Sequence, residues 1–434
     1  MWTFLVLALL HSTPITLEEV RQAARDNLDA LKAELALASS HESARQARSS
    51  IFPQLSAELS ASQTWAGSQR YAFPQISKEF FDVAPYNQTQ LGLRFQLQQL
   101  IYDGGRWWKQ IAKAGFLKEA AEGELAEQRL VSEAEGARRF FELLKTQIAL
   151  EVLENAQQRS VEQLERAKAL FEAGRAPKLD WLNAEINLGS DTIRVVLQRQ
   201  AITKAQVDLL QWLARPYADI RAEHALNSTH STDEAVLVFE EVLDIAQNRR
   251  PLFFALSKRL EAASSAISLA SAGYWPSIFL SLQYQRDSTE LKSFVSDWKK
   301  QNVLLGMFNL RWTLFDGFAT ASDKALASIE QTRVQKDLQQ AEIQLSGDVQ
   351  QALVLLAVQR EVLKLAKQNR QKSEEGLALS SERFVAGQGS SLEIRDAQLR
   401  LLETELTEQQ NRIDLEIAWV LLERVIGGSL EKLR

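Results

Sequence analysis

The hydrophobic and polar positions of the chain follow two different periods. Apolar residues recur at helical spacing over residues 17–50, without an internal Gly or Pro, which predicts a helix. Four later segments alternate with a period of two; in the first, Leu55 and Leu59 alternate with Glu58 and Ser60. This alternation predicts strands with one apolar and one wet face, over about 54–65, 87–102, 276–286 and 302–315.

Two long helical patterns follow the strand pairs. Neither contains a proline, and they predict helices over 104–173 and 317–386, with return helices over 178–214 and 391–426. At 1.5 Å per residue, a helix of about 70 residues would be about 105 Å long. An isolated helix of that length would be unstable, so we expect partner helices along it, in antiparallel coiled coils.

The chain repeats itself at an offset of 213 residues. The matched landmarks are the Asp-Gly junctions after the strand pairs and the glycines that end the long helices: Asp103-Gly104 with Asp316-Gly317, and Gly174 with Gly387. We interpret this pattern as a duplication, with a first repeat over 15–215, a linker over 216–235 and a second repeat over 236–427. Polar loops over about 66–85 and 287–301 connect the strands of each pair.

The amino end carries a short apolar run. Residues 2–10 have the length of the apolar core of an export signal, so we expect residues 1–14 to act as a signal peptide. No stretch approaches the roughly 18 apolar residues that a spanning helix needs.

Composition narrows the function classes. The 434 residues carry a formal net charge of −6, which argues against binding to nucleic acid phosphates. There is no Cys, so disulfides, thiolate metal sites and Cys nucleophiles are excluded. The four His are scattered, and no phosphate-binding loop is present. We therefore expect neither an enzyme nor a cofactor.

The strands have features of membrane strands. Runs of about 10–12 residues are long enough for a tilted strand to cross a bilayer. Trp65, Trp275 and Trp312 lie near strand ends, where aromatic side chains suit the lipid interface. A soluble amphipathic sheet packed on helices is the alternative. Strand length and aromatic placement favour strands that contact lipid and are contributed by several copies to a closed barrel.

The duplicated order of elements, the Asp-Gly junctions and the two return turns resemble the TolC-like outer membrane efflux proteins. Each turn has the pattern F-x-x-G-x-x-x-x-[LI]-[DE], and the resemblance extends from about Leu17 to Gly427. It implies a mixed, mainly α fold in a homotrimer, with four strands per copy in a twelve-stranded transmembrane β-barrel. Long helices would form a periplasmic α-barrel below the outer membrane.

The resemblance also implies a function. Such a channel would passively export small molecules or polypeptides in a tripartite efflux or type I secretion complex. An inner-membrane pump of the RND, ABC or MFS type would supply the energy, and a periplasmic adaptor (membrane fusion protein) would join the two.

In the family the two helix-to-helix turns form the periplasmic tip, where the tunnel closes. Glu393 and Asp396 match acidic residues that ring the constriction, and Asp180 matches the acidic residue after the first turn. Carboxylates from three copies near a narrow axis would favour cations. The alternative is that Asp180 and Glu393 only stabilise the starts of their helices.

The turns depart from the family pattern. Phe384 stands where a tyrosine is expected, and Gly389 stands where an arginine is expected. The hydrogen-bonded latch of some members is therefore in doubt, and Arg175 is a candidate substitute. The resemblance assigns the tip and adaptor docking to Gly174, Arg175, Phe384, Gly387 and Gly389.

Two other functions stay open at this point. The chain could be a coiled-coil scaffold or filament protein with a small β-domain, which would be found in a soluble fraction. It could also be a conduit dedicated to polypeptides, which would share the fold.

Overall fold

The computed structural model describes residues 13–72, 80–223, 238–296, 302–386 and 388–428. Most of the predicted signal peptide over 1–14 lies outside these residues, as does the predicted turn residue Gly387. The described chain divides into two compact units. One is formed by the described parts of Met1–Leu37, Ala120–Ser257 and Asp337–Arg434, and the other by those of Ala38–Glu119 and Lys258–Lys336.

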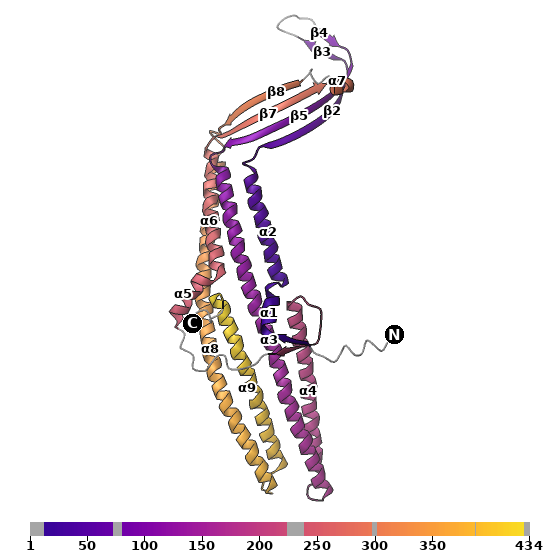
Figure 1. The fold of residues 1–434 in the computed structure, drawn as a ribbon, viewed down its shortest axis with the longest axis vertical. Coiled ribbons are helices and arrows are strands. Elements are labelled where there is room, and N and C mark those ends of the chain that lie inside the picture. Colours follow the sequence, from indigo (N-terminus) through magenta and orange to yellow (C-terminus); the bar gives the residue numbers. More distant parts are fainter. Residues whose placement is uncertain (1–12, 73–79, 224–237, 297–301, 387, 429–434) are drawn as a thin grey trace, which may run out of the picture. The chain divides into compact units, whose positions relative to one another are not determined.

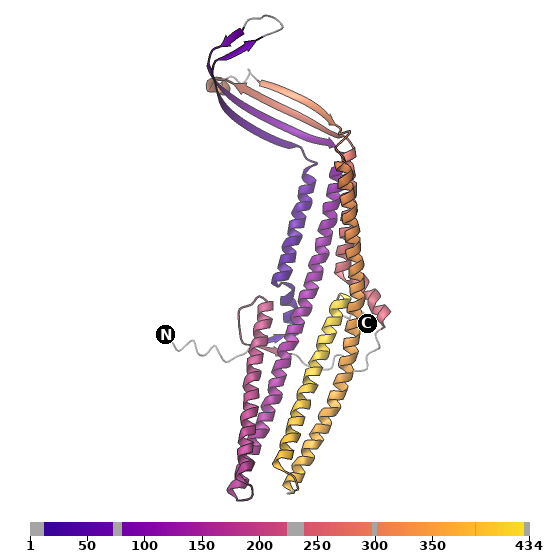
Figure 2. The same cartoon turned by 180° about the vertical axis from the view of Figure 1, so that it is seen from behind.

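Two helices of 67 residues dominate the chain, α3 (Arg106–Glu172) and α8 (Ala319–Val385). Each is followed by a return helix, α4 (Lys178–Trp212) or α9 (Ser391–Ile426). Within the helical unit, α4 runs antiparallel beside the C-terminal part of α3, and α9 runs in the same way beside α8 (Figures 1 and 2). Helix α8 begins and ends 213 residues after α3, which supports the proposed duplication.

Buried side chains from helices far apart in the sequence hold the helical unit together. One cluster surrounds Phe140 and Phe141 of α3, whose rings meet edge to face at 5.6 Å, and includes Leu209 of α4 and Ile413 of α9. A second cluster joins α8 and α9 around Leu356 and includes residues of α5 (Phe239–Arg249). Burial along these seams stabilises helices too long to persist alone.

The helix predicted over 17–50 is interrupted. The structure has α1 (Leu17–Arg25) and α2 (Leu28–Ser49), and the break falls at Asp26 and Asn27. The Asn27 side chain is buried, and its Oδ1 accepts hydrogen bonds from the Ala30 N–H and the Ser132 hydroxyl, at 2.9 and 3.1 Å. An Asn that caps a new helix start accounts for the break, and its partner on α3 is invisible to sequence periodicity.

Helices and strands also occur where loops or a linker were expected. In the linker, β6 (Ile220–Glu223) pairs in parallel with β1 (Thr13–Thr16). In the first loop, β3 (Gln69–Ala72) pairs with β4 (Phe80–Val83). The remaining elements are α6 (Pro251–Ser271), the 3-10 helix η2 (Ala272–Tyr274) and, in the second loop, α7 (Leu291–Ser296).

The other unit contains an antiparallel sheet of four strands in the order β2–β5–β7–β8. Their bounds are Gln54–Ala66, Tyr86–Tyr102, Ser277–Ser288 and Asn302–Arg311. The last strand therefore ends four residues earlier than the predicted 302–315. After Arg311 the chain leaves the sheet to form the Asp316-Gly317 junction. Apolar residues between 312 and 315 continue the period-two alternation beyond the end of the strand, so the sequence pattern predicted a longer strand.

The register gives the sheet two chemically different faces. Ala57, Phe95, Tyr284 and Leu304 lie opposite one another in a row across all four strands. The neighbouring row begins with Glu58 and Arg94, whose side chains form an ion pair of 3.4 Å. On the apolar face many side chains are exposed, including Leu55, Leu59, Phe308 and Leu310. An exposed apolar face of this size marks an interaction surface.

Within the described part of the chain, no helix combines the length and the apolarity that crossing a membrane requires.

Candidate functional site

The first helix-to-helix turn closes with hydrogen bonds typical of a helix C-terminus. The N–H groups of Gly174 and Arg175 donate to the carbonyls of Phe171 and Leu170, at 2.9 and 2.8 Å. Gly174 has a φ of +72°, a left-handed conformation that side chains with a Cβ rarely adopt. Pro177 then precedes the first residue of α4, where the absence of an N–H costs nothing.

The second turn repeats this geometry with a different helix start. The Gln388 N–H donates to the Arg383 carbonyl at 2.8 Å, the counterpart of the bond from Arg175 to Leu170. Here Ser390 caps α9 by accepting a hydrogen bond from the Glu393 N–H at 3.2 Å. A Cβ on Gly389 would lie 3.1 Å from the Phe384 nitrogen, so the chain passes close to the end of α8 at this point.

The two turns are joined by a hydrogen bond. The hydroxyl of Ser391 on α9 donates to Oδ1 of Asp180 on α4 at 3.0 Å. Both residues line a cavity of about 230 Å³ between the hairpins, as does Phe384. Asp180 therefore does more than favour the start of its helix. Its carboxylate accepts a hydrogen bond from the second hairpin, while Phe384 carries no hydroxyl and Gly389 no side chain that could take part in such a bond.

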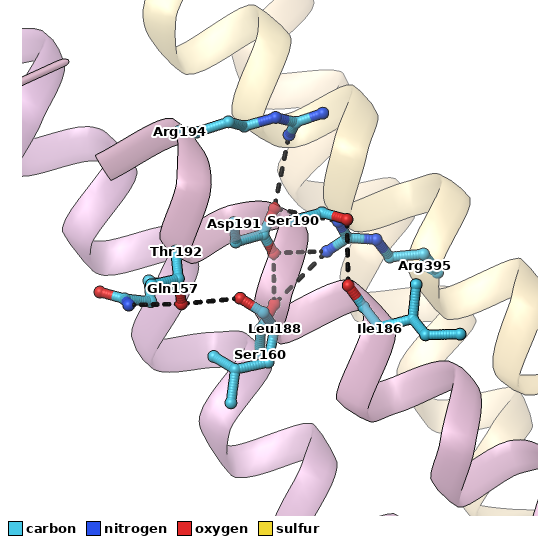
Figure 3. Close-up of polar contacts among 9 residues, drawn as sticks. All are labelled: Gln157, Ser160, Ile186, Leu188, Ser190, Asp191, Thr192, Arg194 and Arg395. Carbon is cyan, nitrogen blue, oxygen red and sulfur yellow. Dashed lines mark hydrogen bonds and ion pairs between the residues drawn. The ribbon is translucent and has the colours of Figure 1, made fainter. Parts of the chain in front are cut away.

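A buried ion pair joins the two hairpins farther along the helices (Figure 3). Arg395 of α9 donates two hydrogen bonds to the Asp191 carboxylate of α4, at 2.8 and 3.0 Å. The Ser160 hydroxyl of α3 donates to the same carboxylate at 2.6 Å, and Arg194 lies 3.4 Å from it. Three helices are thus joined at one carboxylate, whose side chain is 3% exposed.

Opposing effects act on the Asp191 carboxyl. Burial favours its neutral form, whereas the hydrogen bonds from Arg395 and Ser160 favour the charged form and outweigh burial, so the pKa of Asp191 is lowered. The carboxylate is therefore ionised at neutral pH, and the pair can hold the hairpins together. Sequence reasoning missed this cluster, because a charged residue on a long helix is usually solvated.

The predicted constriction residues lie beside basic partners. Glu393 forms an ion pair of 3.0 Å with Arg383, and Asp396 forms one of 2.9 Å with Arg400. Together with Arg400, both carboxylates line an open cavity of about 540 Å³ between α8 and α9. Asp180 lies on the other hairpin and is in neither ion pair.

Arg175 is exposed, and no side-chain hydrogen bond or ion pair of its own is found among the described residues. Its suggested part in a latch stays a prediction. No group of three or more His, Asp or Glu side chains in the described ranges is placed to hold a metal ion.

The two Asp-Gly junctions cap the long helices. Asp103 accepts a hydrogen bond from the Trp107 N–H at 3.1 Å, and Asp316 accepts one from the Thr320 N–H at 2.8 Å. Gly104 and Gly317 both have positive φ, +74° and +65°. Burial raises the pKa of Asp103, whereas the Thr320 hydroxyl and N–H lower the pKa of Asp316. In both repeats, therefore, an Asp-Gly dipeptide forms the connection between the end of a strand and the start of a long helix.

Comparisons with known proteins agree with this architecture. The chain is 23% identical over 360 residues to outer membrane protein TolC of Vibrio cholerae serotype O1, covering 81% of this chain and 80% of that protein. The Campylobacter jejuni CmeC outer membrane channel has a similar fold, with a TM-score of 0.81 and 16% identity, over 95% of this chain and 85% of that one.

The open state of the Neisseria gonorrhoeae MtrE outer membrane channel gives a TM-score of 0.78 at 18% identity, over 95% of this chain and 89% of that one. The model of the family described as "Outer membrane efflux protein" matches residues 20–215 and 242–428, which nearly coincide with the two proposed repeats. The chain therefore belongs to the outer membrane efflux protein family.

Proposed function

We propose that three copies of this chain form one passive export conduit through the outer membrane. The observation that carries this proposal is the four-stranded sheet, in which β2 and β8 each have one neighbour in the described chain. Free edges and an exposed apolar face are unfavourable in a monomer. Twelve strands from three copies would close the sheet, pair the edges and turn the apolar face to lipid.

The aromatic side chains between strands and helices support this placement. Trp108, Trp275, Trp312, Phe315 and Phe318 are all exposed and lie at the strand–helix junctions. Aromatic rings favour the boundary between lipid and water, so these residues suit the periplasmic surface of the membrane. The long helices would then extend into the periplasm.

The helix-to-helix turns suit the far end of such a conduit. We propose that they form the periplasmic tip, where an adaptor docks on the Gly174 turn and the turn at 386–389, and through which an inner-membrane pump delivers substrates. The bond between Ser391 and Asp180 holds the turns of one copy together. We propose small molecules or polypeptides as the substrates, the class that goes with membership of the outer membrane efflux protein family.

Outer membranes extracted with detergent provide the test. A trimer that dissociates on heating, together with loss of export in a strain that lacks the gene, is the expected result. Protein found in the cytosol, or assembled as filaments, would contradict the proposal and favour the scaffold alternative. Co-purification of the trimer with an adaptor tests the docking role separately.

A further inference from the structure

The carboxylates expected to give the tip its negative charge are neutralised within the same chain. Glu393 Oε1 lies 3.0 Å from Arg383 Nη1, and Asp396 Oδ2 lies 2.9 Å from Arg400 Nη2. Arg400 follows Asp396 by one helical turn on α9, whereas Arg383 belongs to the last turn of α8. The two ion pairs therefore have independent structural origins.

Compensation at this range changes the electric field of the turn. Two opposite charges that lie about 3 Å apart act as a dipole at greater distance, so their joint potential falls off much faster than that of a free carboxylate. This holds whichever way the hairpin faces. The cancellation of charge also persists when an ion pair opens and water enters, because each guanidinium stays near its carboxylate. At physiological ionic strength, charges within about 8 Å of one another still interact.

The exposure of these side chains supports a role in selectivity and not in folding. The side chain of Arg400 is 72% exposed and that of Asp396 is 59% exposed. An ion pair this exposed contributes little to stability. In contrast, charges that line a narrow passage strongly affect which ions pass. Asp396 and Arg400 also line the same cavity between α8 and α9.

We propose that Arg383 and Arg400 set the ion selectivity of the tip, by cancelling the charge of Glu393 and Asp396. The inference rests on the proposed function, because it needs a conduit lined by the second turn. The tip would then discriminate weakly between cations and anions, and small anionic as well as cationic substrates could pass. Removing either guanidinium would expose a carboxylate in every copy and make the passage cation-selective.

The experiment is a measurement of reversal potential in planar lipid bilayers under a KCl gradient, with the full-length trimer. Arg400→Gln and Arg383→Gln should each raise the ratio of cation to anion permeability by about twofold or more, and the double variant should raise it further. Arg400→Lys keeps the charge and should keep the wild-type ratio.

Arg333→Gln is the matched control. Arg333 is also an exposed arginine, paired to Glu330 at 2.6 Å, but it belongs to the sheet-containing unit and not to the turn. Its loss should leave the reversal potential unchanged. If the wild type conducts and the Arg383 and Arg400 variants behave like Arg333→Gln, the inference is overturned. A wild-type protein that never conducts would contradict the proposed function itself, and the inference with it.

Discussion

Arg395 and Asp191 lie 204 residues apart in the sequence, yet the guanidinium of Arg395 donates two hydrogen bonds to the Asp191 carboxylate. The side chains are 14% and 3% exposed. Because Ser160 also donates to Asp191, this contact joins α3, α4 and α9. This buried ion pair is shielded from water and holds the two hairpins together, whereas the exposed ion pairs at the turns can exchange with water.

Removal of Arg395 should therefore destabilise the helical unit. Arg395→Met leaves the Asp191 carboxylate buried, with Arg194 at 3.4 Å as its remaining cationic neighbour and the Ser160 hydroxyl as its remaining buried donor. We expect a loss of about 3 kcal/mol in the free energy of unfolding. Urea unfolding of the detergent-solubilised protein measures it. The double variant Arg395→Met with Asp191→Leu should lose less than Arg395→Met alone, because no unpaired charge remains. A double variant that loses the sum of the two single losses would show that the residues do not interact.

The same pair predicts a pH dependence. The pKa of Asp191 is lowered from its ordinary value of 3.8 in the folded protein, so the unfolded chain binds the proton more readily. Its contribution to stability is thus fully present above about pH 5 and is lost as the pH falls through 3.8 and below. Unfolding measured from pH 7 to pH 3 should show the wild type approaching Asp191→Asn at the acid end. A gap between the two that is constant with pH would contradict this account.

Gly174 and Gly189 should respond in opposite ways to alanine. Gly174 has a φ of +72°, so Gly174→Ala strains the turn and should cost about 1 kcal/mol. Gly189 lies within α4 with open space around it, and Gly189→Ala should add about 0.5–1 kcal/mol through helix propensity. Thermal unfolding of the two variants compares them directly. The same sign for both would argue against the turn geometry.

The bond between Ser391 and Asp180 should affect closure of the tip. Ser391→Ala removes the hydroxyl that donates to Asp180, so we expect a larger single-channel conductance or more frequent opening. Arg175→Gln should leave conductance unchanged, since the side chain of Arg175 makes no polar contact within the described chain. Ser190→Ala, which removes only a bond within α4, is the control. A change with Arg175→Gln alone would instead assign the latch to Arg175, acting between copies.

Phe318 and Gly105 occupy equivalent positions in the two repeats and share a left-handed backbone, with φ of +70° and +82°. Phenylalanine is strained in this conformation. Because Phe318 is exposed, Phe318→Gly should gain about 1 kcal/mol of stability in detergent. Gly105→Ala should lose a similar amount. A less stable Phe318→Gly variant would show that contacts of the ring, such as its edge-to-face pair with Phe315 at 5.5 Å, outweigh the backbone strain.

The sequence by itself determined the local structure of this protein and its family. Period-two alternation identified the four long strands, and the absence of proline identified α3 and α8. These signals can be read from the sequence alone because they depend on residues only a few positions apart. They failed at Asn27, where one helix ends and another starts: its Oδ1 accepts from the Ala30 N–H of the new helix and from the Ser132 hydroxyl of α3, and the second contact is tertiary.

Only the tertiary structure decided which charges are free. In the sequence, Asp180, Glu393 and Asp396 are three acidic residues near turns, and Asp191 and Arg395 are two more charges on long helices. The fold brings Ser391 to Asp180, Arg383 to Glu393 and Arg395 to Asp191. The field of a carboxylate depends on groups within a few ångströms. Where those groups come from another helix, the fold alone brings them close.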